Sequence, residues 1–217
     1  NRCTYCSIPN IRGKFRSRPM DELINEAKEL AEMGIKELIV IGQDTTAYGI
    51  DLYGKYELAT LLRRLAKETE IKWLRILYCY PDKITDELLN EFKTNEKLLK
   101  YIDIPIQHIS DRVLKRMNRR GDRESLTALI NKLRARIPDI TIRTTFIVGF
   151  PGETYEEFLD TVSLVKEVKY GSMFTFIYSK RKGTKAAGFP DEITKEEKTK
   201  WFMELLEVQE EIVKANK

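Results

Sequence analysis

The residues with the clearest capacity for chemistry are two cysteines near the start of the sequence. Cys3 and Cys6 form a Cys-x-x-Cys pair in the segment NRCTYCSIP. Such a pair occurs in dithiol redox sites, structural zinc sites and iron–sulfur clusters, so its spacing alone does not choose among them. The surrounding residues have to decide which chemistry the pair supports.

A dithiol redox pair is favoured at a helix N-terminus, where the helix dipole stabilises the thiolate. Residues 7–19 hold two prolines and a glycine, which predicts no helix after the pair. A structural zinc site needs about four Cys or His ligands, but Cys79 and His108 each stand alone on a separate predicted strand. This favours an iron–sulfur cluster and leaves the redox and zinc interpretations open. A third cysteine just before Asn1 would complete Cys-x-x-x-Cys-x-x-Cys and leave one iron without a protein ligand.

The composition is typical of one water-soluble domain. The chain has 217 residues, 42% of them apolar, which suffices for a sizeable core. No signal peptide or run of about 18 apolar residues occurs, and three cysteines without a paired framework suit a reducing compartment. We therefore expect a cytoplasmic protein with no membrane partner. The net charge of +4 is too small to indicate a nucleic-acid partner by itself.

Helical and strand patterns alternate along the chain. Amphipathic helices are predicted over residues 20–33, 57–69, 84–93, 110–118, 122–136, 154–168 and from about 195 onward. Thr194 and Glu197 have the spacing of a capping box at the last of these helices. Strands are predicted over residues 36–42, 72–79, 100–107, 139–148 and 172–179. This alternation predicts an α/β fold with a parallel sheet and outer helices.

Polar or glycine-rich segments end nearly every predicted strand. They lie at residues 42–46, 78–82, 105–108, 149–153 and 178–179. Gly, Pro, Asp and Ser are ordinary turn formers, but the carboxyl ends of the strands carry the site in an α/β barrel. Five such ends together favour a functional site at this edge of the sheet.

The strand faces provide a second indication, because residues two apart point the same way. The residues of strand 139–148 expected to face helices are Ile142, Thr144, Phe146 and Val148. Those expected to face the interior are Thr141, Arg143, Thr145 and Ile147. By the same register Arg75 and Asp103 point inward. An interior arginine is costly unless paired, so Arg75 and Arg143 are expected to pair with Asp103 or to bind a ligand carboxylate.

Several motifs together resemble the central domain of the radical S-adenosylmethionine methylthiotransferases. They are CTYCSIP at 3–9, RG at 12–13, SRP at 17–19, IVGFPGET at 147–154, YS at 178–179 and GT at 183–184. The resemblance covers essentially the whole chain. It implies a partial (β/α)6 TIM-like barrel of the radical SAM type, with the first strand and the first cluster cysteine upstream of Asn1.

The resemblance also implies that residues 1–217 are the radical SAM catalytic domain of a longer protein. That protein would carry an N-terminal methylthiotransferase domain with three cysteines for a second, auxiliary 4Fe-4S cluster. It would also carry a small C-terminal β domain of the TRAM type. On this interpretation the sequence is a fragment that is inactive alone.

The chemistry follows from the same resemblance. Cys3, Cys6 and the upstream cysteine would hold a 4Fe-4S cluster whose fourth iron binds S-adenosyl-L-methionine. The 5′-deoxyadenosyl radical would take a hydrogen from a carbon of the substrate, which then receives a methylthio group. Tyr5, Gln43, Gln107 and Arg143 are expected to contact the S-adenosylmethionine, and no catalytic residue is expected beyond the cluster ligands.

The expected substrate is an aspartate, modified at its β-carbon, in a small-subunit ribosomal protein. Residues 42–54 and 103–108 resemble the branch that acts on it, the RimO branch. Residues 174–184 instead resemble the MiaB-type tRNA branch, so methylthiolation of isopentenyladenosine in tRNA is the alternative. A non-catalytic metal- or cluster-binding module is the alternative from another class. The expected electron donor is a flavodoxin or ferredoxin, and the expected state is a monomer.

The remaining unusual residues are expected to be structural or to contact RNA. The basic residues Arg12, Lys14, Arg16 and Arg18, and the group Lys115, Arg116, Arg119 and Arg120, read as solvated faces or contacts to ribosomal RNA. Cys79 is expected to be a packed core residue, and His108 a loop cap or a residue near the substrate. The apolar face expected on the last helix consists of Trp201, Phe202, Leu205, Val208 and Ile212.

Overall fold

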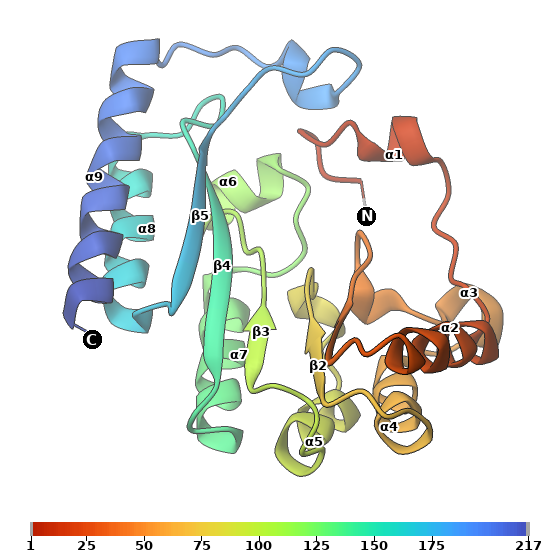
Figure 1. Cartoon of the computed structure of the whole chain (residues 1–217). Coiled ribbons are helices and arrows are strands. Elements are labelled where there is room, and N and C mark those ends of the chain that lie inside the picture. Colours follow the sequence, from red (N-terminus) through yellow and green to blue (C-terminus); the bar gives the residue numbers. More distant parts are fainter. Residues whose placement is uncertain (1, 216–217) are drawn as a thin grey trace. The chain divides into compact units, whose positions relative to one another are not determined.

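The structure is a computed structural model that describes residues 2–215 (Figure 1). These residues group into two compact units. Within the described residues, unit 1 takes in the chain up to Lys14, Pro105–Ile130 and the chain from Arg143 onward. Unit 2 takes in Phe15–Ile104 and Asn131–Ile142.

Unit 2 alternates helices and strands as the sequence predicts. Its elements are α2 (Met20–Glu32), β1 (Glu37–Val40), η1 (Thr45–Ala47), α3 (Ile50–Tyr53), α4 (Leu58–Glu68), β2 (Trp73–Ile76), η2 (Pro81–Lys83), α5 (Asp86–Thr94) and β3 (Tyr101–Asp103). Strands β1 and β2 pair in parallel, from Glu37 beside Trp73 to Val40 beside Ile76. The N–H of Thr141, at the start of β4, donates to the carbonyl of Lys100 over 2.9 Å, which places the first residues of β4 beside β3.

Unit 1 holds the second parallel pair. Its elements are α1 (Ile8–Arg12), α6 (Asp111–Arg116), α8 (Tyr155–Val168), β5 (Ser172–Ile177), η3 (Lys185–Gly188) and α9 (Lys195–Ala215), while α7 (Arg123–Arg136) and β4 (Thr141–Val148) contribute residues to both units. Strands β4 and β5 pair from Arg143 beside Ser172 to Val148 beside Ile177. Figure 1 shows the two strands side by side, with α8 and α9 next to them.

All five predicted strands are present, but each is shorter than predicted, the first three most of all. The predicted ranges included the polar ends of the strands, which leave the sheet. Tyr78 and Gln107 take positive φ angles of 60° and 75°, a conformation that cannot continue a β-ladder. The strand ends are therefore loops, as a site at this edge of the sheet requires.

The prediction of no helix after the cysteine pair was wrong. Helix α1 follows Ser7, and Pro9 is its second residue. The backbone N–H groups of the first turn have no partner within the helix, so a proline there removes no hydrogen bond. Gly13 ends the helix with a φ of 74°, and its N–H donates to the carbonyl of Pro9. The proline and glycine that argued against a helix thus start and stop a short one.

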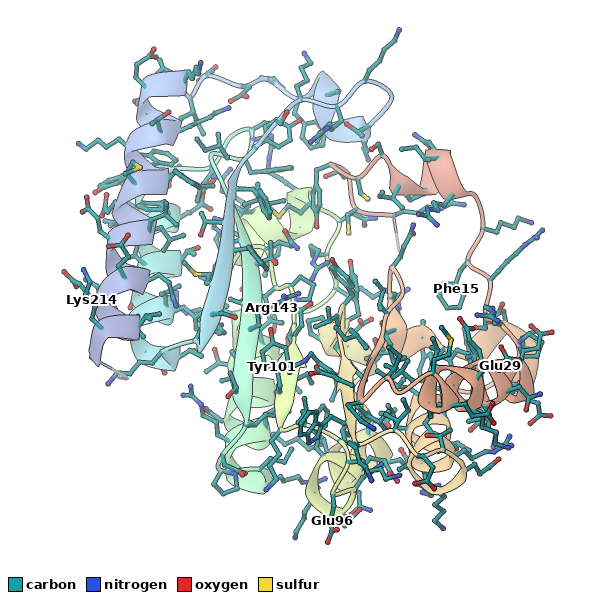
Figure 2. All side chains as sticks on the ribbon, in the orientation of Figure 1. Phe15, Glu29, Glu96, Tyr101, Arg143 and Lys214 are labelled. Atoms are coloured by element: carbon teal, nitrogen blue, oxygen red, sulfur yellow. The ribbon has the colours of Figure 1, made fainter. Side chains whose placement is uncertain are left out.

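The predicted two faces of β4 are confirmed by burial. Ile142, Thr144, Phe146 and Val148 are at most 2% exposed, while the alternate residues are exposed or half-buried. Figure 2 labels Arg143 on β4. The face that carries Arg143 is the less buried of the two.

Helix α9 covers unit 1 with the predicted apolar face. Trp201, Leu205, Val208 and Ile212 are buried, and Trp201 stacks on Phe158 of α8 with ring centroids 5.5 Å apart. The predicted capping box is present, because Thr194 accepts from the N–H of Glu197 and donates its own N–H to that carboxylate. No helix of the described residues is both long and apolar enough to cross a membrane.

Candidate functional site

The cysteine pair lies on a tight turn in unit 1. The N–H of Cys6 donates to the carbonyl of Cys3 over 3.1 Å, and both residues are half-buried and not in a disulfide. Tyr5, between them, meets the ring of Phe150 edge to face with centroids 6.4 Å apart. The turn thus exposes two thiols while its central side chain packs inward.

Thr4 fixes this turn to the end of helix α6. Its N–H donates to the carbonyl of Met117 over 3.0 Å, and its hydroxyl donates to the carbonyl of Arg116 over 2.9 Å. Its own carbonyl accepts from the N–H of Ala186 over 2.9 Å. A buried residue between the cysteines therefore anchors them with three hydrogen bonds.

Arg119 lies directly behind the cysteine turn, and the prediction of a solvated face was wrong for it. The residue is only 8% exposed. Its Nη1 lies 4.0 Å from the Sγ of Cys3, and its Nη2 donates to the carbonyl of Pro105. Arg116 is also partly buried and donates its Nε–H to the carbonyl of Pro151. The burial of Arg119 and Arg116 could not be predicted, because a run of basic residues at a helix end is typical of a solvent-exposed surface.

The other predicted site residues are divided between the two units. In unit 1, Gln107 is inserted beside β4, donating its N–H to the carbonyl of Thr145 and accepting from the N–H of Ile147. Arg143 lies two residues before Thr145 and stacks its guanidinium 4.9 Å from the ring centroid of Phe174. Gln43 belongs to unit 2 and is exposed. Unit 1 therefore brings five of the six predicted residues into one compact body, without Gln43.

Of the two arginines expected to pair with Asp103 or to bind a ligand, Arg75 instead pairs with another carboxylate. Arg75 forms an ion pair with Glu37 over 2.5 Å and stacks on the ring of Tyr101. One oxygen of Asp103 accepts from the N–H of Tyr78 over 2.9 Å. Arg75 is thus neutralised by the neighbouring strand and is not free for a ligand carboxylate.

The GFPGE segment at 149–153 is held by a buried hydrogen-bond network. Glu153 is 4% exposed; one carboxylate oxygen accepts from the Phe150 N–H, and the other lies 2.9 Å from Nε2 of His108. Nδ1 of His108 accepts from the N–H of Ser110 over 3.0 Å, so the ring proton must sit on Nε2 and face Glu153. His108 therefore has the structural, loop-capping role that the sequence favoured over catalysis.

Two glycines of this segment let cations lie against the backbone. Gly149 has a φ of 70°, and a Cβ there would lie 2.4 Å from the Lys198 side chain. Gly152 has a φ of 79°, and a Cβ there would meet the Arg116 guanidinium at 3.0 Å. The glycines thus permit both the left-handed turn and the close packing.

Glu157 begins helix α8 next to this network. Burial raises the pKa of its carboxyl, but bonds from Arg112, the Thr154 N–H and Ser110 outweigh it and lower the pKa to about 2. The contribution of this carboxylate to the stability of the fold is complete above the ordinary pKa of 4.5 and is lost as pH falls from 4.5 towards 2.

We expect the free energy of unfolding to fall more steeply with acid in the wild type than in Glu157→Gln, measured by urea unfolding between pH 4.5 and 2. Equal slopes, or a like effect of the exposed Glu156→Gln, would contradict this.

The third cysteine is separate from the pair, as predicted. Cys79 is 0% exposed, and burial, with the charge of Asp103, raises the pKa of its thiol well above the ordinary value. Such a thiol stays protonated and is a packing group.

The profile of the Radical SAM superfamily matches residues 1–165 of this chain, including the cysteine turn and the GFPGE segment. The chain belongs to the radical SAM superfamily. It is also 51% identical over 212 residues to the ribosomal protein uS12 methylthiotransferase RimO of Carboxydothermus hydrogenoformans. That match covers 98% of this chain and 48% of the relative, so the chain spans about half the length of the curated relatives it matches.

Solved radical SAM enzymes share the fold. Coproporphyrinogen III oxidase (HemN) from Escherichia coli superposes with a TM-score of 0.70 at 21% identity, over 98% of this chain and 50% of that one. Streptococcus suis SuiB, solved bound to S-adenosylmethionine, gives a TM-score of 0.67 at 12% identity, over 97% of this chain and 45% of that one. This likeness confirms the predicted fold class, α/β of the radical SAM type.

The donor set of this radical SAM domain fits part of a cluster site. Cys3 and Cys6 are not joined in a disulfide, and their spacing suits iron–sulfur ligation. Within residues 2–215 no group of three His, Cys, Asp or Glu side chains is placed to hold a metal ion. The predicted third cysteine, upstream of Asn1, lies outside the described residues.

Proposed function

We propose that this chain is the radical domain of a methylthiotransferase that modifies the β-carbon of an aspartate in ribosomal protein uS12. The observation that carries the proposal is the Cys3–Cys6 turn, free of disulfide and anchored to α6, in a superfamily member 51% identical to a RimO enzyme. The enzyme would act in the cytoplasm as a monomer, reduced by a small carrier such as flavodoxin or ferredoxin.

Cys3 and Cys6 would supply two ligands of a 4Fe-4S cluster, and the predicted upstream cysteine the third. The cluster, when bound and reduced, supplies the electron that cleaves S-adenosylmethionine to a carbon-centred radical. An auxiliary cluster in a further domain would provide the inserted sulfur. The residues of this chain bind and orient the cofactor.

Four side chains are the proposed contacts to S-adenosylmethionine. Tyr5 is held by Phe150, so its ring presents a fixed surface beside the two cysteines. Arg143 lies on the less buried face of β4, and a guanidinium can meet a carboxylate in the bidentate manner. Gln107, beside β4, would add a polar contact, and Gln43, which belongs to unit 2, is proposed from the sequence resemblance alone.

A basic rim surrounds the cysteine turn in unit 1 and favours a contact to RNA. It consists of the exposed residues Arg2, Arg12, Lys14, Lys180, Arg181, Lys182 and Lys185. Segments 2–14 and 168–190 contain no acidic residue, and none of the seven rim cations forms an ion pair within residues 2–215. The side-chain amide of Asn10 donates to the carbonyl of Gly183 over 3.3 Å, which joins the two segments. We propose that the rim holds ribosomal RNA next to the uS12 target.

The rim predicts salt-dependent RNA binding. Replacing Lys180, Arg181 and Lys182 by Gln removes three phosphate contacts, so the slope of log affinity against log salt should fall by about 2 for single-stranded RNA. The measurement is fluorescence anisotropy with a labelled small-subunit ribosomal RNA fragment. The control replaces Lys166, Lys195 and Lys200 of the same unit, all exposed. An equal slope in both triple variants would overturn the proposed contact.

The substrate is tested with the full-length enzyme, both clusters reconstituted anaerobically. It is incubated with S-adenosylmethionine, dithionite and either a uS12 loop peptide or an isopentenylated tRNA anticodon stem. We expect mass spectrometry to find the methylthio group on the peptide aspartate. Modification of the tRNA alone would assign the chain to the MiaB-type alternative. Failure to cleave S-adenosylmethionine would leave the cluster-binding module as the function.

A further inference from the structure

Arg119 is a buried cation whose place is set by the end of helix α6. The helix ends at Arg116, and Asn118 takes a positive φ of 55°, which turns the chain back. The N–H of Arg119 then donates to the carbonyl of Leu114 over 2.9 Å. This turn directs the guanidinium away from solvent, towards Cys3 and Pro105.

The contact of Arg119 with Cys3 is chemically specific. A guanidinium carries five N–H donors in a rigid plane and stays charged at every relevant pH. One edge donates to the carbonyl of Pro105, which leaves Nη1 directed at the Cys3 sulfur, 4.0 Å away. A cysteine that ligates iron does so as a thiolate, which accepts N–H···S bonds and attracts a cation.

The anchoring of the turn does not require this charge. Thr4 makes three hydrogen bonds to the chain around α6 and η3, and the side-chain amide of Asn118 donates to the carbonyl of Arg2 over 2.8 Å. These neutral contacts fix the backbone on both sides of Cys3. The positive charge of Arg119 is therefore not needed to hold the backbone of the turn, and its effect is expected on the Cys3 sulfur.

We propose that Arg119 is a positioning residue that raises the reduction potential of the cluster held by Cys3 and Cys6. The added electron makes the cluster more negative, and a fixed cation beside one thiolate ligand stabilises that state. Hydrogen bonds and charge near the ligand sulfurs are among the factors that set cluster potentials. This inference rests on the proposed cluster site.

The test is a dithionite redox titration of the reconstituted full-length protein, followed by electron paramagnetic resonance. The signal that changes on addition of S-adenosylmethionine identifies the cluster in question. Arg119→Met is expected to make reduction about tenfold less favourable, a fall of about 59 mV for a one-electron couple. The matched control is Lys115→Met, which removes an exposed charge from helix α6, four residues before Arg119.

A second readout covers the case in which Arg119→Met does not hold the cluster. In wild-type protein labelled with ¹⁵N-arginine, pulsed resonance on the reduced cluster should show a ¹⁵N coupling that Arg119→Lys removes. A loaded Arg119→Met variant with an unchanged potential, or a wild type without that coupling, would overturn the inference. A wild type that holds no cluster on Cys3 and Cys6 would instead overturn the proposed function.

Discussion

Replacing either Cys3 or Cys6 by Ala is expected to abolish cluster binding in the radical domain and, with it, the cleavage of S-adenosylmethionine. In the proposed cluster site each thiolate would hold one iron, and within residues 2–215 no group of three His, Cys, Asp or Glu side chains is placed to hold a metal ion instead. The loss of 5′-deoxyadenosine formation should exceed about a thousandfold, because the reaction has no alternative electron source. Iron and sulfide per chain, with product measured by chromatography, give both readouts.

Cys79 provides the matched control for this prediction. Its thiol is fully buried in unit 2, so Cys79→Ala changes packing only. We expect iron content and cleavage to stay at the wild-type level, with a small loss of stability. If Cys79→Ala lost as much iron as Cys3→Ala, the pair would not be the ligands.

Replacing Glu153 by Gln is expected to cause the largest loss of stability among substitutions in the site. The carboxylate accepts from the Phe150 N–H and the His108 Nε2–H, and His108 cannot shift its proton because Nδ1 already accepts from Ser110. The amide of Gln would direct a donor at a donor. Leaving a buried donor without its acceptor costs about 3 kcal/mol, which lowers Tm by roughly 6 to 12 °C for a domain of this size.

Differential scanning calorimetry of the protein measures this loss. Glu156→Gln, an exposed change of the same charge on the first turn of α8, should stay within about 0.5 kcal/mol. His108→Leu should destabilise as Glu153→Gln does, and the double variant should lose less than the sum, because both act on one bond. If the two losses of stability were additive, His108 and Glu153 would not be energetically coupled.

The sequence was sufficient to predict the longer helices, the presence of the strands and the faces of β4, because these depend on local periodicity. The alternation of Ile142, Thr144, Phe146 and Val148 matched burial residue by residue. The capping box at Thr194 was also predictable, since both partners lie within one turn. Short-range patterns of this kind are fixed by the backbone geometry of each element.

What the sequence could not predict depends on contacts between distant segments. Arg119 and Cys3 are 116 positions apart, and only the fold brings the guanidinium to the sulfur. The pairing of Arg75 with Glu37 was missed because it depends on which strands are neighbours. Helix α1 was missed for a local reason: a proline is compatible with a helix when it falls in the first turn.

The most direct test of the proposed function follows the hydrogen atom that is removed from the β-carbon of the target aspartate. The reconstituted full-length enzyme is given S-adenosylmethionine, dithionite and a uS12 loop peptide that carries deuterium on the β-carbon of its target aspartate. We expect deuterium to be transferred to 5′-deoxyadenosine and the same aspartate to gain the methylthio group. Formation of 5′-deoxyadenosine without deuterium, while the peptide keeps its label, would contradict the proposed function.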